Sequence, residues 1–523
     1  MSLAPIRVST AQNRFSPLRV WPIVMVLAMG LLLASCTNTA TQTVTARFTP
    51  ERPPEGAPEG APKGASERAP ERAPEGAPET VSEGASEGAP ETVAEGAPER
   101  APERAPERPP ERAPERPPSA RQEYTQTLTG KLILGYQGWF QCPTDAPGGQ
   151  WAHWFAGTSP TVDFLPDVSE LPNQDRCASP LVAADGTPIP LFSSTAPAVT
   201  DLHFGWMEKY GLDGVALQRF ATHLTQPKLA EQLDRVLSNV QSGAEKHQRV
   251  FFIMYDLSGL PHTDLPLVAR DWAHLEALGV TKSKSYLRHR GHPLLALWGL
   301  GFAGRPVKPQ DAKSLLAALS SASAAFGGVT FFGGVPANWR LGKGDAEPGW
   351  GEIWPMLGVL SPWTVGRYSD PAGIESYRKT LLEPDLAETR RIGIDYMPVV
   401  FPGFSSSHLM RVRKPPNEAS INQIPRQCGR FYWQQIADAM GAGATMLYGA
   451  MFDEVDEGTA MFKVLPRATQ VPGTGTVAGE SFVTLDADGC RLPSDWYLRL
   501  AGAATDALRE GRPPVNELPF RLP

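Results

Sequence analysis

The chain has 523 residues, of which 41% are hydrophobic and 20% are charged, and its formal net charge at pH 7 is −7. Nucleic-acid binding proteins need a basic surface to neutralise phosphates, and neither the net charge nor any basic stripe in the sequence provides one. We therefore expect no nucleic acid among the partners of this protein.

The first 35 residues have the pattern of a bacterial secretory signal. Three arginines precede an apolar run from Val20 to Leu33, which is short for a membrane span. The run ends in Leu-Ala-Ser-Cys at Cys36 and resembles a lipobox, the signal at which a chain is cut before a cysteine that then carries lipid. A plain signal peptide and an uncleaved anchor are the alternatives. The resemblance implies a lipid-anchored protein of the cell envelope, and Thr37, which is not acidic, favours the outer membrane, facing either the periplasm or the surface.

Residues 36–122 are predicted to form a disordered linker. Four-residue units such as Arg-Ala-Pro-Glu and Glu-Gly-Ala-Pro repeat from about Glu51 to Pro118. Proline every few residues forbids an α-helix, and too few residues are apolar to form a core. We expect an extended tether that holds the following domain away from the lipid surface.

Residues 123–523 are predicted to form one (β/α)8 barrel of the α/β class. Eight apolar runs are typical of buried strands, and helical patterns separate several of them. The runs span residues 131–140, 214–220, 250–256, 294–299, 328–334, 360–366, 395–401 and 445–450, and the helical patterns span 228–237, 312–319, 431–440 and 495–500. Pro362 weakens the sixth strand assignment, because proline cannot donate to a ladder. In a barrel of this kind the working face lies at the C-terminal ends of the strands.

Two glutamates, Glu454 and Glu457, directly follow the last apolar run. A pair of carboxylates at the end of a strand is what a glycosidase needs, because one group handles a proton while the other acts on the sugar ring or on water. A solvated acidic turn is the alternative. We predict that Glu454 and Glu457 are the catalytic residues.

Other strands also end in polar or aromatic residues. At a barrel mouth, aromatic rings can stack on the C–H faces of sugars while polar groups bind hydroxyls. Alternatively, each tryptophan packs the barrel against its helices, Asp256 caps the turn at Ser258, or Arg219 pairs with a catalytic carboxylate and holds it ionised. The candidate substrate-binding residues at these strand ends are Tyr136, Trp139, Gln218, Arg219, Asp256, Trp298, Trp363 and Asp453.

The acidic segment resembles a known motif. Residues 453–459, Asp-Glu-Val-Asp-Glu-Gly-Thr, are similar to the Asn-Glu-Trp-His-Glu-Gly-Thr motif of the endo-α-mannosidases, glycoside hydrolase family 99. The approach at 398–404, Pro-Val-Val-Phe-Pro-Gly-Phe, and Tyr-Trp at 432–433 also resemble that family, and residues 210–217 resemble the opening strands of families 71 and 99. The likeness covers roughly Leu132 to Phe462.

The resemblance implies a retaining glycosidase, with Phe404 added to the substrate-binding residues. In family 99 the first glutamate is proposed to act as a base on the substrate's own 2-hydroxyl, giving an epoxide-like intermediate, and the second protonates the leaving oxygen and later activates water. Those roles fall to Glu454 and Glu457. The sequence differs from the motif at Asp453, Val455 and Asp456, where the family has asparagine, tryptophan and histidine.

Four cysteines follow Cys36, and an exported protein can form disulfides. Cys142, Cys177, Cys428 and Cys490 allow three pairings, which sequence does not distinguish. The shortest separation favours Cys142–Cys177.

We expect no metal or other cofactor, because this chemistry needs none. The sequence contains no cysteine or histidine spacing typical of structural zinc, and the segment 486–489 is interpreted as a turn. The expected partner is an oligo- or polysaccharide, and the expected state is a monomer. Two other hypotheses remain: a non-catalytic surface glycan-binding lipoprotein, and a metal-assisted hydrolase that uses Asp256, Asp453 and Glu454. The sequence leaves open the sugar, the linkage and endo or exo action.

Overall fold

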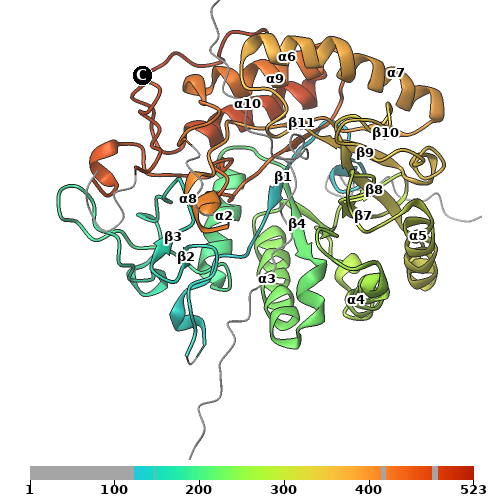
Figure 1. Ribbon diagram of the computed structural model, residues 1–523, viewed down its shortest axis with the longest axis horizontal. Coiled ribbons are helices and arrows are strands. Elements are labelled where there is room, and N and C mark those ends of the chain that lie inside the picture. Colours follow the sequence, from blue (N-terminus) through green and yellow to red (C-terminus); the bar gives the residue numbers. More distant parts are fainter. Residues whose placement is uncertain (1–122, 147, 414–419, 474–480) are drawn as a thin grey trace, which may run out of the picture. The chain divides into compact units, whose positions relative to one another are not determined.

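The computed structural model describes residues 123–523, apart from 147, 414–419 and 474–480 (Figure 1). The signal segment, Cys36 and the repeat linker predicted above lie outside the described residues. Among the described residues, no helix has the length and apolar character needed to cross a membrane.

Parallel strands alternate with helices along the chain, and the helices lie outside the strands (Figure 1). The strands of the main sheet are β1 (Leu132–Tyr136), β4 (Gly214–Phe220), β5 (Val250–Asp256), β7 (His292–Trp298), β8 (Thr330–Pro336), β9 (Val359–Trp363), β10 (Asp395–Tyr396), β11 (Val399–Val400) and β12 (Leu447–Gly449). The helices are α2 (Pro197–Lys209), α3 (Pro227–Lys246), α4 (Leu265–Ala277), α5 (Pro309–Ser323), α6 (Pro371–Tyr377), α7 (Glu383–Ile392), α8 (Ser407–Arg413), α9 (Arg430–Gly441) and α10 (Trp496–Glu510). Short antiparallel pairings add a hairpin of β2 (Phe155–Ala156) with β3 (Ser159–Pro160), and β6 (Arg288–His289) on β7.

The sheet closes into a barrel of eight strands. Its order is β10-β9-β8-β7-β5-β4-β1-β12-β11, and β10 and β11 belong to one stretch of chain, residues 395–400. The Met397 N–H donates to the carbonyl of Leu360 on β9 (2.8 Å), and the Tyr448 N–H on β12 donates to the carbonyl of Pro398 (2.9 Å). This stretch therefore bridges β9 and β12 as one strand, and the predicted (β/α)8 barrel is confirmed.

All eight predicted strand positions are occupied, with two local differences. The seventh is divided into β10 and β11 around Pro398, which has no N–H to donate. The sixth, β9, tolerates Pro362 near its end. β10 pairs only with Val359 and Leu360, so the missing N–H of Pro362 interrupts no ladder on that side.

Side chains along each strand alternate between the barrel interior and the helix layer. On β5, Met254 contacts Tyr448 inside the barrel, with 3.7 Å between Sδ and Oη. Its neighbour Tyr255 points outward and donates to Asp271 of α4 at 2.5 Å. Both surroundings are dry, which is why the strands have continuous apolar sequences.

Two disulfides link the described cysteines. Cys142–Cys177 is present as expected, and it ties the segment after β1 to the long connection that precedes α2. Cys428–Cys490 joins the start of α9 to the segment before α10. Each bond shortens the loop that the unfolded chain can explore and thereby stabilises a connection that has little regular structure.

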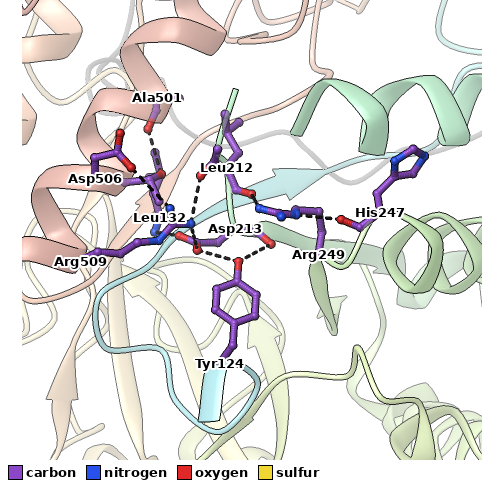
Figure 2. Close-up of polar contacts among 11 residues, drawn as sticks. Tyr124, Leu132, Leu212, Asp213, His247, Arg249, Ala501, Asp506 and Arg509 are labelled. Carbon is purple, nitrogen blue, oxygen red and sulfur yellow. Dashed lines mark hydrogen bonds and ion pairs between the residues drawn. The ribbon is translucent and has the colours of Figure 1, made fainter. Parts of the chain in front are cut away.

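A buried carboxylate ties both ends of the described chain to the N-terminal side of the barrel. Figure 2 shows Asp213, which precedes β4, at the centre of this cluster. One of its oxygens accepts from Tyr124 Oη (2.8 Å) and Arg509 Nη2 (2.7 Å), and the other accepts from the Leu132 N–H (2.9 Å). Asp213 is fully buried, so these three donors replace the water that the carboxylate loses on folding.

We expect Asp213→Ala to lower the free energy of unfolding by about 3 kcal/mol, because it leaves Arg509 without its buried partner and removes an acceptor from β1. Urea-induced unfolding would measure this loss. Asp506→Ala is the matched control, because Asp506 also lies beside Arg509, at 3.5 Å, but is exposed. Equal effects of the two substitutions would contradict the role given to Asp213.

Candidate active site

The acidic segment forms a loop directly after β12, at the C-terminal end of the barrel. Asp453, Glu454 and Asp456 are buried, and Glu457 is partly exposed. Glu454 Oε1 accepts from Gln137 Nε2 (2.7 Å), and Oε2 accepts from Thr459 Oγ1 (2.8 Å). Both oxygens of Glu454 therefore have a fixed donor, which sets the orientation of the carboxyl group.

Asp453 supports the structure of the site. Its two oxygens accept from the backbone N–H groups of Gln137 (2.8 Å) and Gly138 (3.0 Å), just after β1. The backbone of Gln137 is thus held by Asp453 while its side chain holds Glu454. These contacts give Asp453 a structural role in the site, and its direct binding of substrate stays a prediction.

Another buried carboxylate, Asp163, holds the acidic loop at Val455. Its N–H donates to the Val455 carbonyl (3.1 Å), and its side chain accepts from the Ser407 N–H (2.8 Å) and His408 Nδ1 (2.6 Å). The neighbouring Ser405 N–H donates to the Glu457 carbonyl (3.0 Å). The start of α8 and the acidic loop are therefore fixed to one another.

Burial makes the loop retain protons near neutral pH. It raises the pKa of Asp453 to about 7, and also that of Asp456. The pKa of Glu457 is likewise about 7, raised by burial and then by the charge of Asp456, while Arg413 opposes the rise. The pKa of Glu454 is raised well above its ordinary range by burial and then by the charges of Glu457 and Asp456. The two glutamates are thus close enough to influence each other's ionisation.

Asp456 is the least satisfied member of the loop. It is 1% exposed, and neither of its oxygens has a hydrogen-bond donor among the described residues. His153 Nδ1 lies 3.5 Å from Asp456 Oδ2, and burial lowers the pKa of this imidazole to about 3, so the ring stays neutral. The positive charge that opposes the raised pKa of Asp456 is that of Arg413.

Trp139 lies in a stack of rings beside the loop. His153 covers it at a centroid distance of 4.0 Å and Phe220 at 5.0 Å, both nearly parallel to the indole. Trp139 is only 5% exposed, so its packed ring offers little surface to a sugar. Its Nε1–H is buried and has no acceptor among the described residues.

Gln218 and Arg219 separate because they are neighbours on one strand. Gln218 points into the barrel, where its Nε2 lies 3.4 Å from Tyr448 Oη. Arg219 points outward and forms ion pairs with Asp271 (2.5 Å) and Asp234 (2.7 Å) of the surrounding helices. The hypothesis that Arg219 pairs with a catalytic carboxylate is wrong, because the strand turns it toward the helix layer.

Asp256, Trp298 and Trp363 come together at the ends of β5, β7 and β9. Trp298 meets Trp363 edge to face at 5.4 Å, and Arg305 lies over the Trp298 ring at 5.6 Å. The Ser258 N–H donates to Asp256 Oδ1 (2.7 Å), which confirms the capping alternative for that oxygen. The tryptophans are almost completely buried, so they shape this wall mainly by packing.

Tyr136 and Phe404 lie at different depths. Tyr136 is fully buried, and its Oη lies 3.0 Å from His203 Nδ1 of α2, so it packs the barrel against that helix. Phe404 is partly exposed and exchanges backbone hydrogen bonds with Ile424. Since Ser405 contacts the Glu457 carbonyl, Phe404 is the aromatic candidate that lies next to the acidic loop.

The main cavities lie away from these residues. The larger, about 760 Å³, is at the N-terminal side of the barrel and is lined in part by Tyr124, Lys131 and Arg509. Another of about 490 Å³ lies between the β8–β9 connection and α7. Within the described part of the chain, no three His, Cys, Asp or Glu side chains are placed to hold one metal ion. Asp256, Asp453 and Glu454 therefore do not form the metal centre of the third hypothesis.

The raised pKa of Asp456 predicts how stability depends on pH. Its pKa rises from 3.8 to about 7 on folding, so at intermediate pH the folded chain holds a proton that the unfolded chain has lost. The contribution of Asp456 to the free energy of unfolding is fully present below about pH 4, and it is lost as the pH rises through about 7.

Asp456→Asn removes the carboxyl group, and with it the loss of stability that comes from its ionisation above about pH 7. We expect it to raise the free energy of unfolding at pH 8 on the order of 2 kcal/mol and to change it little at pH 4. Urea unfolding at the two pH values would measure the difference, with the exposed Asp506→Asn as control. An identical change at both pH values would show that Asp456 is not charged and buried as described.

Known proteins share the fold of this chain, but none of the sequence comparisons assigns it to a family. No protein-family model and no curated protein matches the chain. Two solved structures of the GH99 endo-α-mannosidase from Bacteroides thetaiotaomicron are similar to it, one of them in complex with bis-tris-propane. At 15% identity they give TM-scores of 0.52 and 0.51 and cover 73% and 74% of this chain and 98% and 99% of their own. The expected likeness to family 99 is therefore confirmed at the level of the fold.

Proposed function

We propose that this protein is a glycoside hydrolase that cleaves an α-linked glycan with retention of configuration, using Glu454 and Glu457. The observation that carries the proposal is the pair itself. Both glutamates lie on one rigid loop at the C-terminal end of β12, where barrels of this type have their working face. Their likeness in sequence to the family 99 motif and the shared fold support the same function.

The surroundings of the two glutamates differ in ways that fit two roles. Glu454 receives donors from Gln137 and Thr459, and hydrogen bonds of this kind favour the ionised form expected of a base. Glu457 is the more exposed of the two, and its pKa of about 7 suits an acid that keeps its proton near neutral pH. Glu454 would act on the sugar, through its 2-hydroxyl as in family 99, while Glu457 protonates the leaving oxygen and then activates water.

Repulsion between the glutamates would keep one proton on the pair. Burial and the charge of Glu457 raise the pKa of Glu454, so both groups do not ionise together easily. Burial and the charges of neighbouring carboxylates raise the pKa of both groups, and we assign the carboxylate to Glu454 because Gln137 and Thr459 donate to its two oxygens, with the remaining proton on Glu457. That combination supplies one base and one acid at the same pH.

The proposed setting is the cell envelope. Lipid on Cys36 and the repeat linker would place a monomeric barrel near the membrane, where exported glycans are available. A glycan-binding lipoprotein without turnover is the competing function, and the intact glutamate pair favours the hydrolase.

Turnover by the glutamate pair can be tested by substitution. We expect Glu454→Gln and Glu457→Gln each to reduce kcat/KM by roughly 1,000-fold or more on a hydrolysed α-glucan, α-mannan or other α-linked oligosaccharide. Reducing-end release would measure the rates, and NMR of the first product would give the anomeric configuration. Asp506→Asn, remote from the loop, should retain full activity. Absence of hydrolysis by the unmodified chain across the α-linked panel would leave the binding function instead.

The acid role of Glu457 predicts the alkaline side of the pH profile. Its proton is lost above about pH 7, so kcat/KM should fall as the pH rises beyond that value. Asp456→Asn removes the neighbouring charge that raises the Glu457 pKa, so the fall should begin at lower pH. Initial rates between pH 4 and pH 9 would show the shift. An alkaline limb that is the same in both proteins would assign the titration to another group.

A further inference from the structure

Arg305 is a cation at the barrel mouth without an acidic partner. It follows β7 on a loop that contains Gly299, Gly301 and Gly304, and its guanidinium lies over Trp298 at 5.6 Å and Phe302 at 5.7 Å. No hydrogen bond or ion pair joins this guanidinium to another described residue. It is partly buried, and burial lowers its pKa while the nearby Asp256 opposes that effect.

Two other arginines around the barrel have carboxylate partners, whereas the buried Arg426 donates to the backbone carbonyls of Gly458 and Ala460. Arg219 has Asp271 and Asp234, and Arg340 pairs with Asp385 at 2.7 Å. A charge taken out of water is costly unless it has a partner. The partly buried guanidinium of Arg305 has neither a carboxylate nor a carbonyl partner among the described residues, and it lies at the end of the barrel where a ligand is expected.

Two acidic side chains near the Arg305 loop, Glu347 and Asp345, already have other partners. Glu347 accepts from Lys308 Nζ (3.1 Å) and from the Gly304 N–H (3.3 Å). Asp345 pairs with Arg367 at 2.7 Å and also accepts from the backbone of the β8–β9 connection. These contacts hold the two loops together, and neither carboxylate lies within ion-pair distance of the Arg305 guanidinium.

The barrel order places Arg305 across the mouth from the acidic loop. In the closed ring, three strands separate β7 from β12 in either direction, counting β10 and β11 as one. A negative group near Glu454 and Glu457 would be repelled, whereas the same group at β7 would meet a cation held on two rings.

We infer that the glycan bound by this protein carries an anionic group, a carboxylate or a sulfate ester, on a sugar unit beside the cleaved linkage, and that Arg305 is the residue that binds it. The planar fork of a guanidinium fits either oxyanion with two parallel hydrogen bonds. Trp298 and Phe302 are positioning residues, because they support the guanidinium from below. The inference rests on the proposed function for the meaning of the cleaved linkage.

Charge-matched oligosaccharides test the inference by binding. The probes are α-linked trigalacturonate against its fully methyl-esterified form, and maltotriose 6-O-sulfate against maltotriose. Affinities are measured by calorimetry on the full chain carrying Glu457→Gln, so that turnover does not consume the probe. In that background we compare Arg305→Met, Arg305→Lys and the control Arg391→Met, an exposed arginine on α7 that pairs with Glu388.

We expect at least one acidic probe to bind about tenfold or more tighter than its neutral partner. Arg305→Met should abolish that preference, Arg305→Lys should keep part of it, and Arg391→Met should keep all of it. The pair that shows the preference identifies carboxylate or sulfate. Thermal unfolding midpoints would establish that the variants are folded.

Two results would overturn the inference: acidic probes that bind no tighter than neutral ones, including no binding at all, or a preference that survives in Arg305→Met. Hydrolysis of neutral glycans by the unmodified chain as fast as that of their acidic partners would also count against it while leaving the proposed function intact. Conversely, an Arg305-dependent preference without any turnover by the unmodified chain would remove the hydrolase proposal and leave the anion site.

Discussion

The site depends on four carboxyl groups in one loop after β12, of which Asp453, Glu454 and Asp456 are buried and Glu457 is partly exposed. Such burial is tolerated only where hydrogen-bond donors or protons offset the lost hydration. Asp453 is offset by two backbone N–H groups and Glu454 by Gln137 and Thr459, whereas Asp456 and Glu457 rely on protons. The residues after β1 hold the loop in one shape by donating to Asp453 and Glu454. Because this shape keeps the carboxyl groups out of water, they retain protons near neutral pH.

Closure of the barrel is what makes this arrangement possible. β1 and β12 are far apart in sequence but adjacent in the ring, so the residue after β1 reaches the loop after β12. Gln137 uses this contact twice, through its backbone toward Asp453 and through its side chain toward Glu454. The Asp213 cluster secures the opposite end of the same strand by accepting from the Leu132 N–H. The five residues of β1 therefore connect the Asp213 cluster at one end to the Gln137 contacts that orient Asp453 and Glu454 at the other.

The strands could be predicted from sequence because both of their surroundings are apolar, and this produces continuous hydrophobic runs. Because both faces of a strand are apolar, the sequence does not show whether a given side chain points into the barrel or toward the helices. Gln218 and Arg219 differ by one position and face opposite layers, and no local pattern tells which is inward. Trp139 carries no sequence signal that His153 and Phe220 stack against it. Contacts of this kind depend on long connections whose path the sequence does not specify. Asp163, a lone acid in such a connection, was missed for that reason.

Charged groups are distributed unequally around the C-terminal end of the barrel. Acidic groups gather after β12, while Arg305 lies on the opposite wall beside Asp256, which lacks a partner within ion-pair distance. A neutral sugar chain could cross such a mouth either way round with similar energy. A chain with one anionic unit would be held in a single orientation, because reversing it would place the anion against the carboxyl groups. In the proposed retaining reaction the leaving oxygen must meet the acid and the ring must meet the base, so a fixed orientation of the glycan would itself contribute to catalysis.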